Sequence, residues 1–358
     1  MLLLEAQSLA LGLPTSFRSN RKPHLFRTAD DQDAPKLSAR TINHNQQEQS
    51  HGEKPAKTQR KKKKKKQHHH NLAAYHGELD LASLSQGDQS RYHELASQCL
   101  VHPAMFPVEM RKYWRNRHRL FSLYDQGCLL DSESWFSVTP ESVAFRIAAR
   151  CSSERTVLDL FGGAGGNAIQ FALTAEQVLV IEIDELKIQL AEWNAEIYGV
   201  RDRIRFVHGD AVEFLHAVNE YRRDSATNGE SSATESDVEV YRGITRRDVD
   251  QIHVVFLSPP WGGVNYMSHD HDFSLNSLLP IPGKRLFELA TAITPNIAYY
   301  LPRNTSLHQL AELADLNTDS TVKIEQQWLS EHKLSSITAY YGQLATEWDD
   351  DKDAWITS

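Results

Sequence analysis

Residues 156–167 read Thr-Val-Leu-Asp-Leu-Phe-Gly-Gly-Ala-Gly-Gly-Asn. The first six have the apolar pattern of a short buried strand, the glycines form a turn, and residues 168–173 continue as an amphipathic helix. Strand, glycine turn and helix form the first unit of a doubly wound α/β sheet, in which ligands bind at the carboxyl ends of the strands. Glycine lets the backbone approach a ligand closely, because no Cβ intervenes. Taken alone, such a turn could equally hold a dinucleotide.

The segments on either side repeat this alternation of strands and helices. Apolar runs predict strands at residues 177–182, 205–208, 252–257 and 296–301, and helices at 142–150 and 185–198. Thr139 is expected to cap the first helix, with Pro140 at its first helical position. The alternating segments 322–329 and 334–341 predict an antiparallel terminal hairpin. We therefore expect an α/β protein with a mostly parallel sheet.

Acidic residues stand at the ends of three successive predicted strands. Asp159 precedes the glycines, where its carboxylate could face a positively charged cofactor group. Glu182 ends the next strand and can accept from both hydroxyls of a ribose, a role that would also suit NAD. Asp210 follows the third strand, where it could accept from an adenine amino group. No site for hydride transfer is visible beside them, so the three acids favour S-adenosylmethionine, which carries ammonium and sulfonium charges.

The predicted strand at 252–257 runs into Ser258-Pro259-Pro260-Trp261-Gly262-Gly263. Each proline fixes φ and lacks an N–H, and the residue before it is driven to an extended conformation. We therefore expect a stiff backbone whose carbonyl groups point outward and can accept hydrogen bonds from an amino group. The Trp261 ring offers a flat base a surface on which to stack. The pattern indicates methyl transfer to an exocyclic amine of a base.

Charge is distributed unevenly along the 358 residues. Residues 1–70 carry 15 basic and 6 acidic residues, a net charge of +9. The remainder holds 24 of the 39 basic and 41 of the 47 acidic residues, a net charge of −17. A nucleic-acid substrate would therefore need a local basic patch.

The cysteines and the apolar runs bound the class of protein further. Cys99, Cys128 and Cys151 lack metal-ligand spacing and fit a reducing compartment, so neither a metal nor disulfides are expected. No apolar run approaches the roughly 20 residues of a membrane span. The start, Met1–Glu5, lacks the basic region of a secretory signal, whereas the Arg- and Ser-containing first 27 residues leave a mitochondrial presequence open.

Composition divides the chain into four expected regions. Residues 1–72 are polar and biased, which predicts a disordered tail, and Lys61–Lys66 within it is typical of a nuclear-localisation or RNA-binding segment. Residues 73–140 predict a helical extension that packs on the catalytic domain; its segment 112–121 interleaves basic and aromatic residues, suited to phosphate contact and stacking or to core packing. The catalytic domain is expected at 141–345, with a disordered insertion at 224–248, before an acidic tail at 346–358.

These motifs together resemble the trimethylguanosine synthases, a family of enzymes that hypermethylate RNA caps. The likeness runs from about residue 112 to 344, and its most specific parts are Trp135-Phe136-Ser137-Val138-Thr139-Pro140-Glu141 and Leu257-Ser258-Pro259-Pro260-Trp261-Gly262-Gly263. The other matching strings are Tyr113-Trp114, Arg119-Leu120-Phe121-Ser122, the glycine stretch, Asn194-Ala195-Glu196-x-Tyr198-Gly199, Leu301-Pro302-Arg303-Asn304 and Ile337-Thr338-Ala339-Tyr340. The short tail and the 224–248 insertion suggest a fungal-type member.

The resemblance implies a class I methyltransferase fold, Rossmann-like, with a mostly parallel seven-stranded sheet and an antiparallel carboxyl-terminal hairpin. It implies that S-adenosyl-L-methionine donates two methyl groups in succession to N2 of a 7-methylguanosine cap, leaving S-adenosyl-L-homocysteine. The substrates would be capped small nuclear and small nucleolar RNAs, with snRNP or snoRNP proteins and import factors as further partners. We expect a monomer in the nucleus, at nucleolar or Cajal-body-like sites, with some in the cytoplasm.

The same resemblance implies roles for individual residues. Trp261 would stack on the cationic 7-methylguanine, which a Trp face attracts by roughly 0.5–2 kcal/mol. Ser258 and the Pro259 carbonyl would hold the N2 amine in line with the methyl group, completing the catalytic set. The expected cofactor-binding residues are Phe136, Thr139, Asp159, Phe161, Gly163, Gly165, Asn167, Glu182, Asp210 and Ser258. The expected cap-binding residues are Trp261, Ser258, Asn194, Asn304 and, at the phosphates, Arg303.

Two residues depart from the family pattern. Ser142 stands where a phosphate-binding lysine is expected, so Arg303 or the basic stretch 111–119 would take over that contact. Glu182 stands where Asp is frequent, and either can accept from a diol.

Two other functions stay open at this point. The first is guanine-N2 methylation inside rRNA or tRNA, which would share the glycine loop and the Pro-Pro-aromatic clamp. The second is a non-catalytic cap-binding or assembly factor, which would be expected to have lost Asp159, the glycines or Ser-Pro-Pro-Trp.

Overall fold

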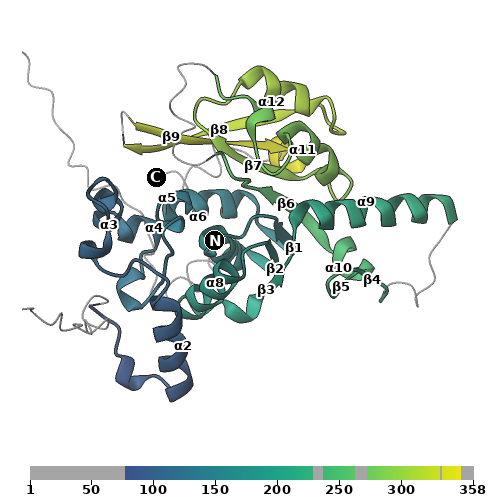
Figure 1. The fold of residues 1–358 in the computed structure, drawn as a ribbon. Coiled ribbons are helices and arrows are strands. Elements are labelled where there is room, and N and C mark those ends of the chain that lie inside the picture. Colours follow the sequence, from purple (N-terminus) through teal and green to yellow (C-terminus); the bar gives the residue numbers. More distant parts are fainter. Residues whose placement is uncertain (1–76, 229–236, 263–271, 331–332, 348–358) are drawn as a thin grey trace, which may run out of the picture. The chain divides into compact units, whose positions relative to one another are not determined.

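The computed structural model describes residues 77–228, 237–262, 272–330 and 333–347, and Figure 1 labels its elements. The predicted tail at 1–72, with Lys61–Lys66, and the acidic residues 348–358 lie outside the described residues. Within the described ranges, no helix has the length and apolar character that crossing a membrane requires.

A seven-stranded sheet forms the centre of the described structure, in the order β3-β2-β1-β6-β7-β9-β8. The strands are β1 (Ser153–Asp159), β2 (Ala175–Glu182), β3 (Ile204–His208), β6 (Ile252–Leu257), β7 (Ile297–Pro302), β8 (Val322–Ser330) and β9 (Lys333–Tyr341). The first five in chain order pair in parallel, whereas β9 is antiparallel to both β7 and β8. This confirms the predicted fold. Strand order reverses between β1 and β6, which is where such sheets bind ligands.

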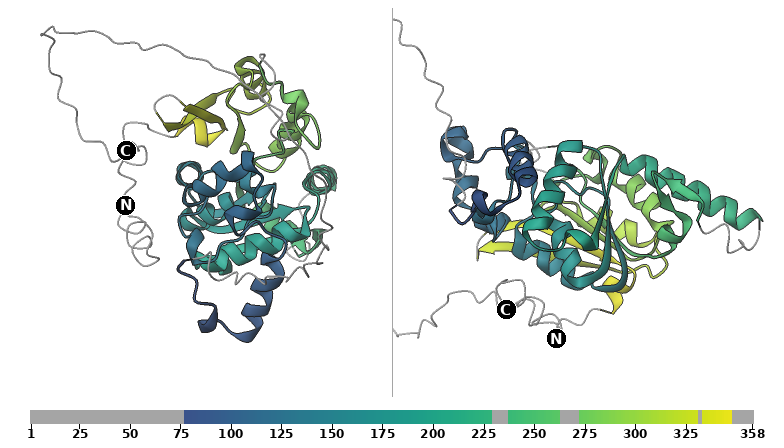
Figure 2. Two further views of the ribbon diagram at one scale, coloured as in Figure 1. Left: turned by 60° about the vertical axis from the view of Figure 1, so that its left-hand side comes forward. Right: turned by 90° about the horizontal axis from the view of Figure 1, so that it is seen from below.

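Alternating side chains on the strands enter two separate cores. On β1, Val157 belongs to one core and Leu158 to the other. The first core is packed by α6 (Glu141–Arg150), α7 (Gly166–Thr174) and α8 (Glu185–Ile197). The second is packed by α9 (Ala211–Asn228), α10 (Arg246–Asp250), α11 (Gly283–Thr291) and α12 (Leu307–Ala314). Figure 1 shows α6 and α8 of the first core apart from α11 and α12 of the second, and Figure 2 gives two further views of the fold. Shorter helices are η6 (Arg201–Arg203), η9 (Leu275–Ser277) and α13 (Gln343–Thr346).

The residues before α6 form short helices that pack on the first core. They are η2 (Leu81–Ser83), α2 (Gln86–Ala96), η3 (Pro103–Met105), η4 (Val108–Met110), α3 (Arg111–Arg115), α4 (Arg117–Leu120), η5 (Tyr124–Gln126) and α5 (Ser134–Ser137). Phe106, Trp114, Tyr124 and Trp135 form an aromatic cluster with ring centroids 4.9–5.9 Å apart. Three of them are buried members of the first core and Trp114 packs against it, so this segment and the helices of the sheet share one interior.

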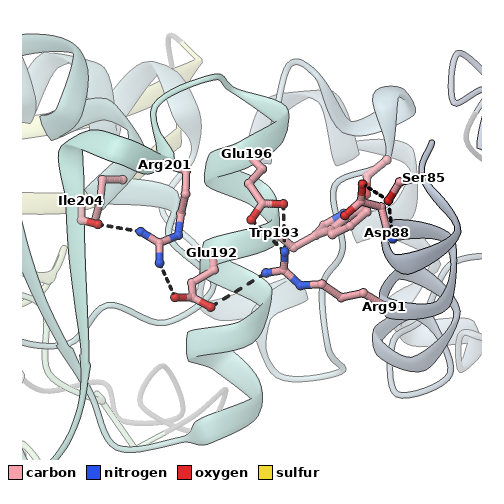
Figure 3. A network of polar contacts seen from close by, with 9 residues as sticks. Ser85, Asp88, Arg91, Glu192, Trp193, Glu196, Arg201 and Ile204 are labelled. Carbon is pink, nitrogen blue, oxygen red and sulfur yellow. Dashed lines mark hydrogen bonds and ion pairs between the residues drawn. The ribbon is translucent and has the colours of Figure 1, made fainter. Parts of the chain in front are cut away.

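Arg91 of α2 lies at the centre of a polar network with α8 (Figure 3). Its guanidinium donates to both carboxylate oxygens of Glu196, at 2.7 and 2.9 Å, and lies 5.5 Å from the ring centroid of Trp193. One turn earlier, Glu192 pairs with Arg201 at 2.6 Å and lies 3.8 Å from Arg91. Ionic and apolar contacts together therefore join α2 to α8.

Helix α6 begins at Glu141, one residue before the predicted bound of 142 and one residue after Pro140, which was expected at the first helical position. Pro140 is its N-cap and Glu141 its first helical residue, and no side chain caps its first turn. Thr139 does not cap the helix, because its Oγ1 is turned toward the glycine loop and accepts from Asn167 Nδ2 at 3.0 Å.

The region predicted as a disordered insertion is largely structured where it is described. Helix α9 continues to Asn228, and β4 (Glu239–Tyr241) and β5 (Ile244–Thr245) form a hairpin before α10. Residues 229–236 lie outside the described residues. The prediction of disorder rested on polar composition and overlooked two local features. Ile244 and Val249 are fully buried in the second core. Thr245 and Asp248 form a capping box at the start of α10.

Candidate functional site

A cavity of about 820 Å³ opens at the carboxyl ends of the strands, at the switch point between β1 and β6. The glycine loop after β1, the ends of β2 and β3 and the segment after β6 form its walls. Residues 136–139, before α6, form a further wall. Its position is the one that the strand topology favours for a ligand.

The glycine loop is shaped by close backbone approach. Gly163 and Gly165 have positive φ, +50° and +89°. A Cβ on Gly162 would meet Val180 Cγ1 at 2.3 Å, and one on Gly165 would lie 3.1 Å from Ala191 Cα. The loop is therefore held against β2 and α8 at distances that only glycine permits. At its end, Asn167 Oδ1 is buried and has no hydrogen-bond partner among the described residues.

Asp159 lies fully buried behind this loop, at the end of β1. Its Oδ1 accepts from Phe161 N at 3.2 Å, whereas Oδ2 is buried and finds no partner in the described chain. Burial raises the pKa of this carboxyl to about 7; the Phe161 N–H acts in the opposite direction, and the nearby Glu182 charge adds to the increase. A buried carboxylate oxygen without a donor is suited to a cationic ligand group, so the S-adenosylmethionine ammonium fits this position.

Glu182 fastens the glycine loop to the end of β2. Its Oε2 accepts from Gly163 N at 2.7 Å and its Oε1 from Asp184 N at 3.0 Å. Each carboxylate oxygen has a further lone pair for a ribose hydroxyl. Asp210, at the end of β3, uses Oδ1 to accept from Val212 N at 2.7 Å, at the start of α9. The two acids lie in the cavity wall, as the strand-end pattern predicts.

The predicted amine clamp lies on the opposite side of the loop. Ser258 Oγ donates to the Phe161 carbonyl at 3.4 Å, and the Pro260 carbonyl accepts from Leu279 N at 3.2 Å. The Trp261 ring is partly buried against both cores. No donor of the described residues reaches the Pro259 carbonyl. A stiff carbonyl and a fixed aromatic ring thus meet at one wall of the cavity, although the Pro260 carbonyl is already used by the fold.

Most of the residues predicted for the site line this cavity. They are Phe136, Thr139, Phe161, Gly163, Asn167, Glu182, Asp210, Ser258, Pro259 and Trp261. Asp159, at the end of β1, and Gly165, within the glycine loop, do not line the cavity.

Asn194 was predicted to contact the cap, but it does not line the cavity. Its side chain is fully buried on α8, accepts from Leu129 N at 2.8 Å, and donates to the carbonyls of Leu129 and Ala164 at 3.0 Å each. These bonds hold the glycine loop to the segment before α5, so Asn194 supports the site from behind.

Arg303 and Asn304 follow β7 and do not line the cavity either. Arg303 is exposed, and its guanidinium donates to the Leu334 carbonyl of β9 at 3.3 Å. Their contact with cap phosphates stays a prediction.

Several lining residues escaped the sequence analysis. Lys187 of α8 pairs with Glu133 at 2.8 Å across the cavity wall. Burial lowers the pKa of Lys187, but Glu133 and other nearby carboxylates outweigh burial and raise it. Tyr300 of β7 packs on Trp261, with ring centroids 5.2 Å apart. Lys112 and Tyr113 also line the cavity, and both belong to the basic and aromatic stretch that the sequence analysis identified.

The family model and the two sequence relatives give one consistent result. Residues 154–344 match the family model described as RNA cap guanine-N2 methyltransferase. The chain is 35% identical over 262 residues to the trimethylguanosine synthase of Schizosaccharomyces pombe, covering 72% of this chain and 96% of that protein. It is 32% identical to the trimethylguanosine synthase of Saccharomyces cerevisiae, covering 56% of each. Among solved structures, a protein named as a methyltransferase from Porphyromonas gingivalis W83 is 13% identical, with a TM-score of 0.45 over 72% of this chain and 59% of that one.

Proposed function

The chain belongs to the RNA cap guanine-N2 methyltransferase family, and we propose that it adds two methyl groups in succession to N2 of a 7-methylguanosine cap. The substrate is capped RNA and the methyl donor S-adenosylmethionine. The observation that carries the proposal is one cavity lined both by the strand-end acids Glu182 and Asp210 and by the clamp of Ser258, Pro259 and Trp261.

The cofactor end of the cavity consists of acids placed by three strand ends. Asp159 Oδ2 would accept from the cofactor ammonium, Glu182 from the ribose hydroxyls, and Asp210 from the adenine amino group. When bound, S-adenosylmethionine supplies a methyl group on a sulfonium. The chain's own contribution is to hold these groups in a fixed orientation, since alignment supplies much of the rate in a reaction with an activated donor.

The substrate end is built to hold a cationic base and its amine. A 7-methylguanine ring carries positive charge, and stacking on Trp261 is worth roughly 0.5–2 kcal/mol more for a cation than for a neutral ring. The Pro259 carbonyl and Ser258 Oγ would accept from the N2 amine and direct its lone pair toward the methyl group. No strong base is needed, because the amine proton can leave to water after transfer.

Methyl transfer from labelled S-adenosylmethionine to m7GTP, with GTP as control and mass analysis of the products, tests the proposal. We expect products with one and then two added methyl groups from m7GTP and none from GTP. Transfer to neither nucleotide, with cofactor binding intact, would favour the alternative of a guanine inside rRNA or tRNA. Uncapped rRNA and tRNA transcripts serve as substrates for testing that alternative.

We further propose that the substrates are small nuclear and small nucleolar RNAs and that the enzyme acts as a monomer in the nucleus, without a metal. The Lys61–Lys66 run supports this location, because such runs are typical of import signals. A fluorescent fusion should concentrate in the nucleus, and replacement of the six lysines by glutamine should redistribute it. Analysis of cap structures on these RNAs after depletion of the protein tests the substrate class.

A further inference from the structure

A basic surface adjoins the cavity on the side of α3 and α4. It consists of Arg111, Lys112, Arg115 and Arg119, all of which are exposed, and we refer to it as the basic face. Lys112 also lines the cavity, and α3 contacts α5, whose Phe136 forms part of the cavity wall. Figure 1 shows α3, α4 and α5 next to one another. The basic face therefore begins at the edge of the cavity.

The charges of the basic face are not neutralised by the fold. Elsewhere, arginines such as Arg91 and Arg201 are held by the glutamates of α8 (Figure 3). Within α4 itself, Arg117 pairs with Asp125 at 3.0 Å. In the described part of the chain, no carboxylate forms an ion pair with any of the four residues of the basic face.

The carboxylates nearest in sequence do not alter this conclusion. Asp125 is shared by Arg117 and His118, and Glu133 is bound to Lys187. Glu109, in η4, is exposed. Its single negative charge cannot balance the four positive charges of the basic face. The aromatic rings beside them are fixed, since Trp114 belongs to the aromatic cluster and Lys112 Nζ lies 5.0 Å from the Tyr113 ring centroid.

We propose that the basic face binds the phosphates of the RNA strand that follows the cap, an inference that rests on the proposed function. With a net charge of −17 after residue 70, the rest of the chain repels RNA, so a local basic patch has to supply the attraction. A strand leaving the cavity meets Lys112 at its edge and then the three arginines. An acidic protein segment would find the same charges, but the continuity with the cap cavity favours RNA.

The experiment compares a short and a long substrate on the full-length protein. Arg115→Gln and Arg119→Gln are combined, since neither residue lines the cavity, and Lys284→Gln on α11, also exposed, is the matched control. KM and kcat are measured for m7GTP and for a capped 20-nucleotide RNA between 50 and 300 mM salt. Binding of capped and uncapped RNA of the same sequence is measured in parallel by fluorescence anisotropy.

We expect a higher KM for the capped RNA, and a loss of kcat/KM that is several-fold larger for the capped RNA than for m7GTP. Each phosphate contact contributes a slope of about −0.7 to log affinity against log salt, so removing two should reduce the slope by about 1.4. If the two proteins bind equally at 1 M salt, this difference in slope makes the variant bind about 25-fold more weakly than the wild type at 0.1 M salt. Lys284→Gln should leave the slope and both KM values as in the wild type.

Two results would overturn the inference. An unchanged KM and salt slope for the RNA would leave the basic face to an acidic protein partner. An equal loss on m7GTP and on RNA would mean that the arginines support the cap site or the fold. If wild-type protein failed to methylate m7GTP at all, the proposed function would fail, while the salt slope for uncapped RNA would still test the basic face separately.

Discussion

The ring of Trp261 packs on Tyr300 with centroids 5.2 Å apart and planes inclined at 42°. Trp261 follows β6 and Tyr300 belongs to the neighbouring strand β7, so the sheet itself sets the position of the ring. Tyr300 is 6% exposed and belongs to the first core, which makes it a rigid support. The stacking surface is therefore fixed before any base arrives.

Trp261→Ala is expected to abolish methyl transfer to m7GTP while leaving cofactor binding unchanged. The variant loses the cation–π attraction of roughly 0.5–2 kcal/mol and also the surface that orients the base. Initial rates and calorimetric titration with S-adenosylhomocysteine measure the two effects. Trp328→Ala is the matched control, because that Trp is 50% exposed on β8 and lies outside the cavity. Retained cap methylation by Trp261→Ala would contradict the assigned role.

Cofactor affinity should rise with pH between 5.5 and 7.5. Burial raises the pKa of Asp159 to about 7, so below that pH the carboxyl is protonated and must release its proton to accept from the ammonium. The apparent affinity is then expected to change by up to about tenfold per pH unit below pH 7 and to level off above it. Titrations in buffers of different ionisation enthalpy report the proton release. Asp159→Asn should bind weakly at every pH without this slope.

The raised pKa of Asp159 should also make the cofactor-free protein less stable as the pH rises. The pKa of this carboxyl in the folded protein lies above the ordinary value of 3.8, so its contribution to stability without cofactor is lost as pH rises toward 7. Asp159→Asn should therefore raise the Tm of the cofactor-free protein at pH 8 and have little effect near pH 4.5. A lower Tm at pH 8 would mean that the carboxylate has a partner in the protein.

Gly165→Ala is expected to destabilise the protein by about 1–3 kcal/mol. The residue has φ +89°, and the new Cβ would lie 3.1 Å from both Cα and Cβ of Ala191. Gly87→Ala is the opposite case, because Gly87 lies within α2, with Ser85 Oγ at 3.7 Å as the nearest atom to the new Cβ. That variant should be neutral or stabilised by up to about 1 kcal/mol. Chemical denaturation of both variants gives the comparison.

Asn194→Ala should lower stability rather than cap affinity. The substitution leaves the amide of Leu129 and two carbonyls without their partner in a buried position, at a cost of about 1–3 kcal/mol for each group that finds no substitute. We expect a lower Tm with a near wild-type KM for m7GTP at temperatures below it. Asn276→Ala, at an exposed position, serves as control. A raised KM for m7GTP together with an unchanged Tm would instead support the sequence-based prediction that Asn194 contacts the cap.

The sheet could be predicted from sequence because its strands carry strong local patterns. The runs ending at Glu182 and Leu257 are apolar, short and followed by residues that stop a strand, and the structure ends those strands at the same residues. The first run was predicted to reach Phe161, but β1 ends two residues earlier, at Asp159. Glu182 and Asp210 line the cavity for the same reason, since parallel strands share one carboxyl edge.

Other features depended on distant contacts that no local pattern encodes. Thr139 has the residue type and position of an N-cap, but a partner 28 residues away, Asn167, turns its side chain elsewhere. Lys187 and Glu133 are 54 residues apart and meet only because α8 packs beside the segment that leads into α5. Asn194 occurs in a string that resembles the family, and a shared string cannot tell a ligand contact from a buried support.

Helix α2, the aromatic cluster and α8 share one hydrophobic core, so the folded catalytic unit includes residues that precede β1. The family model matches from residue 154 onward, yet Trp193 within that stretch is covered by Tyr92 from before it, at 5.7 Å between ring centroids. Excised at that boundary, the stretch would expose a broad aromatic face and lose the cavity wall at residues 136–139. The stretch that the family model matches is thus shorter than the part of the chain whose residues share this hydrophobic core.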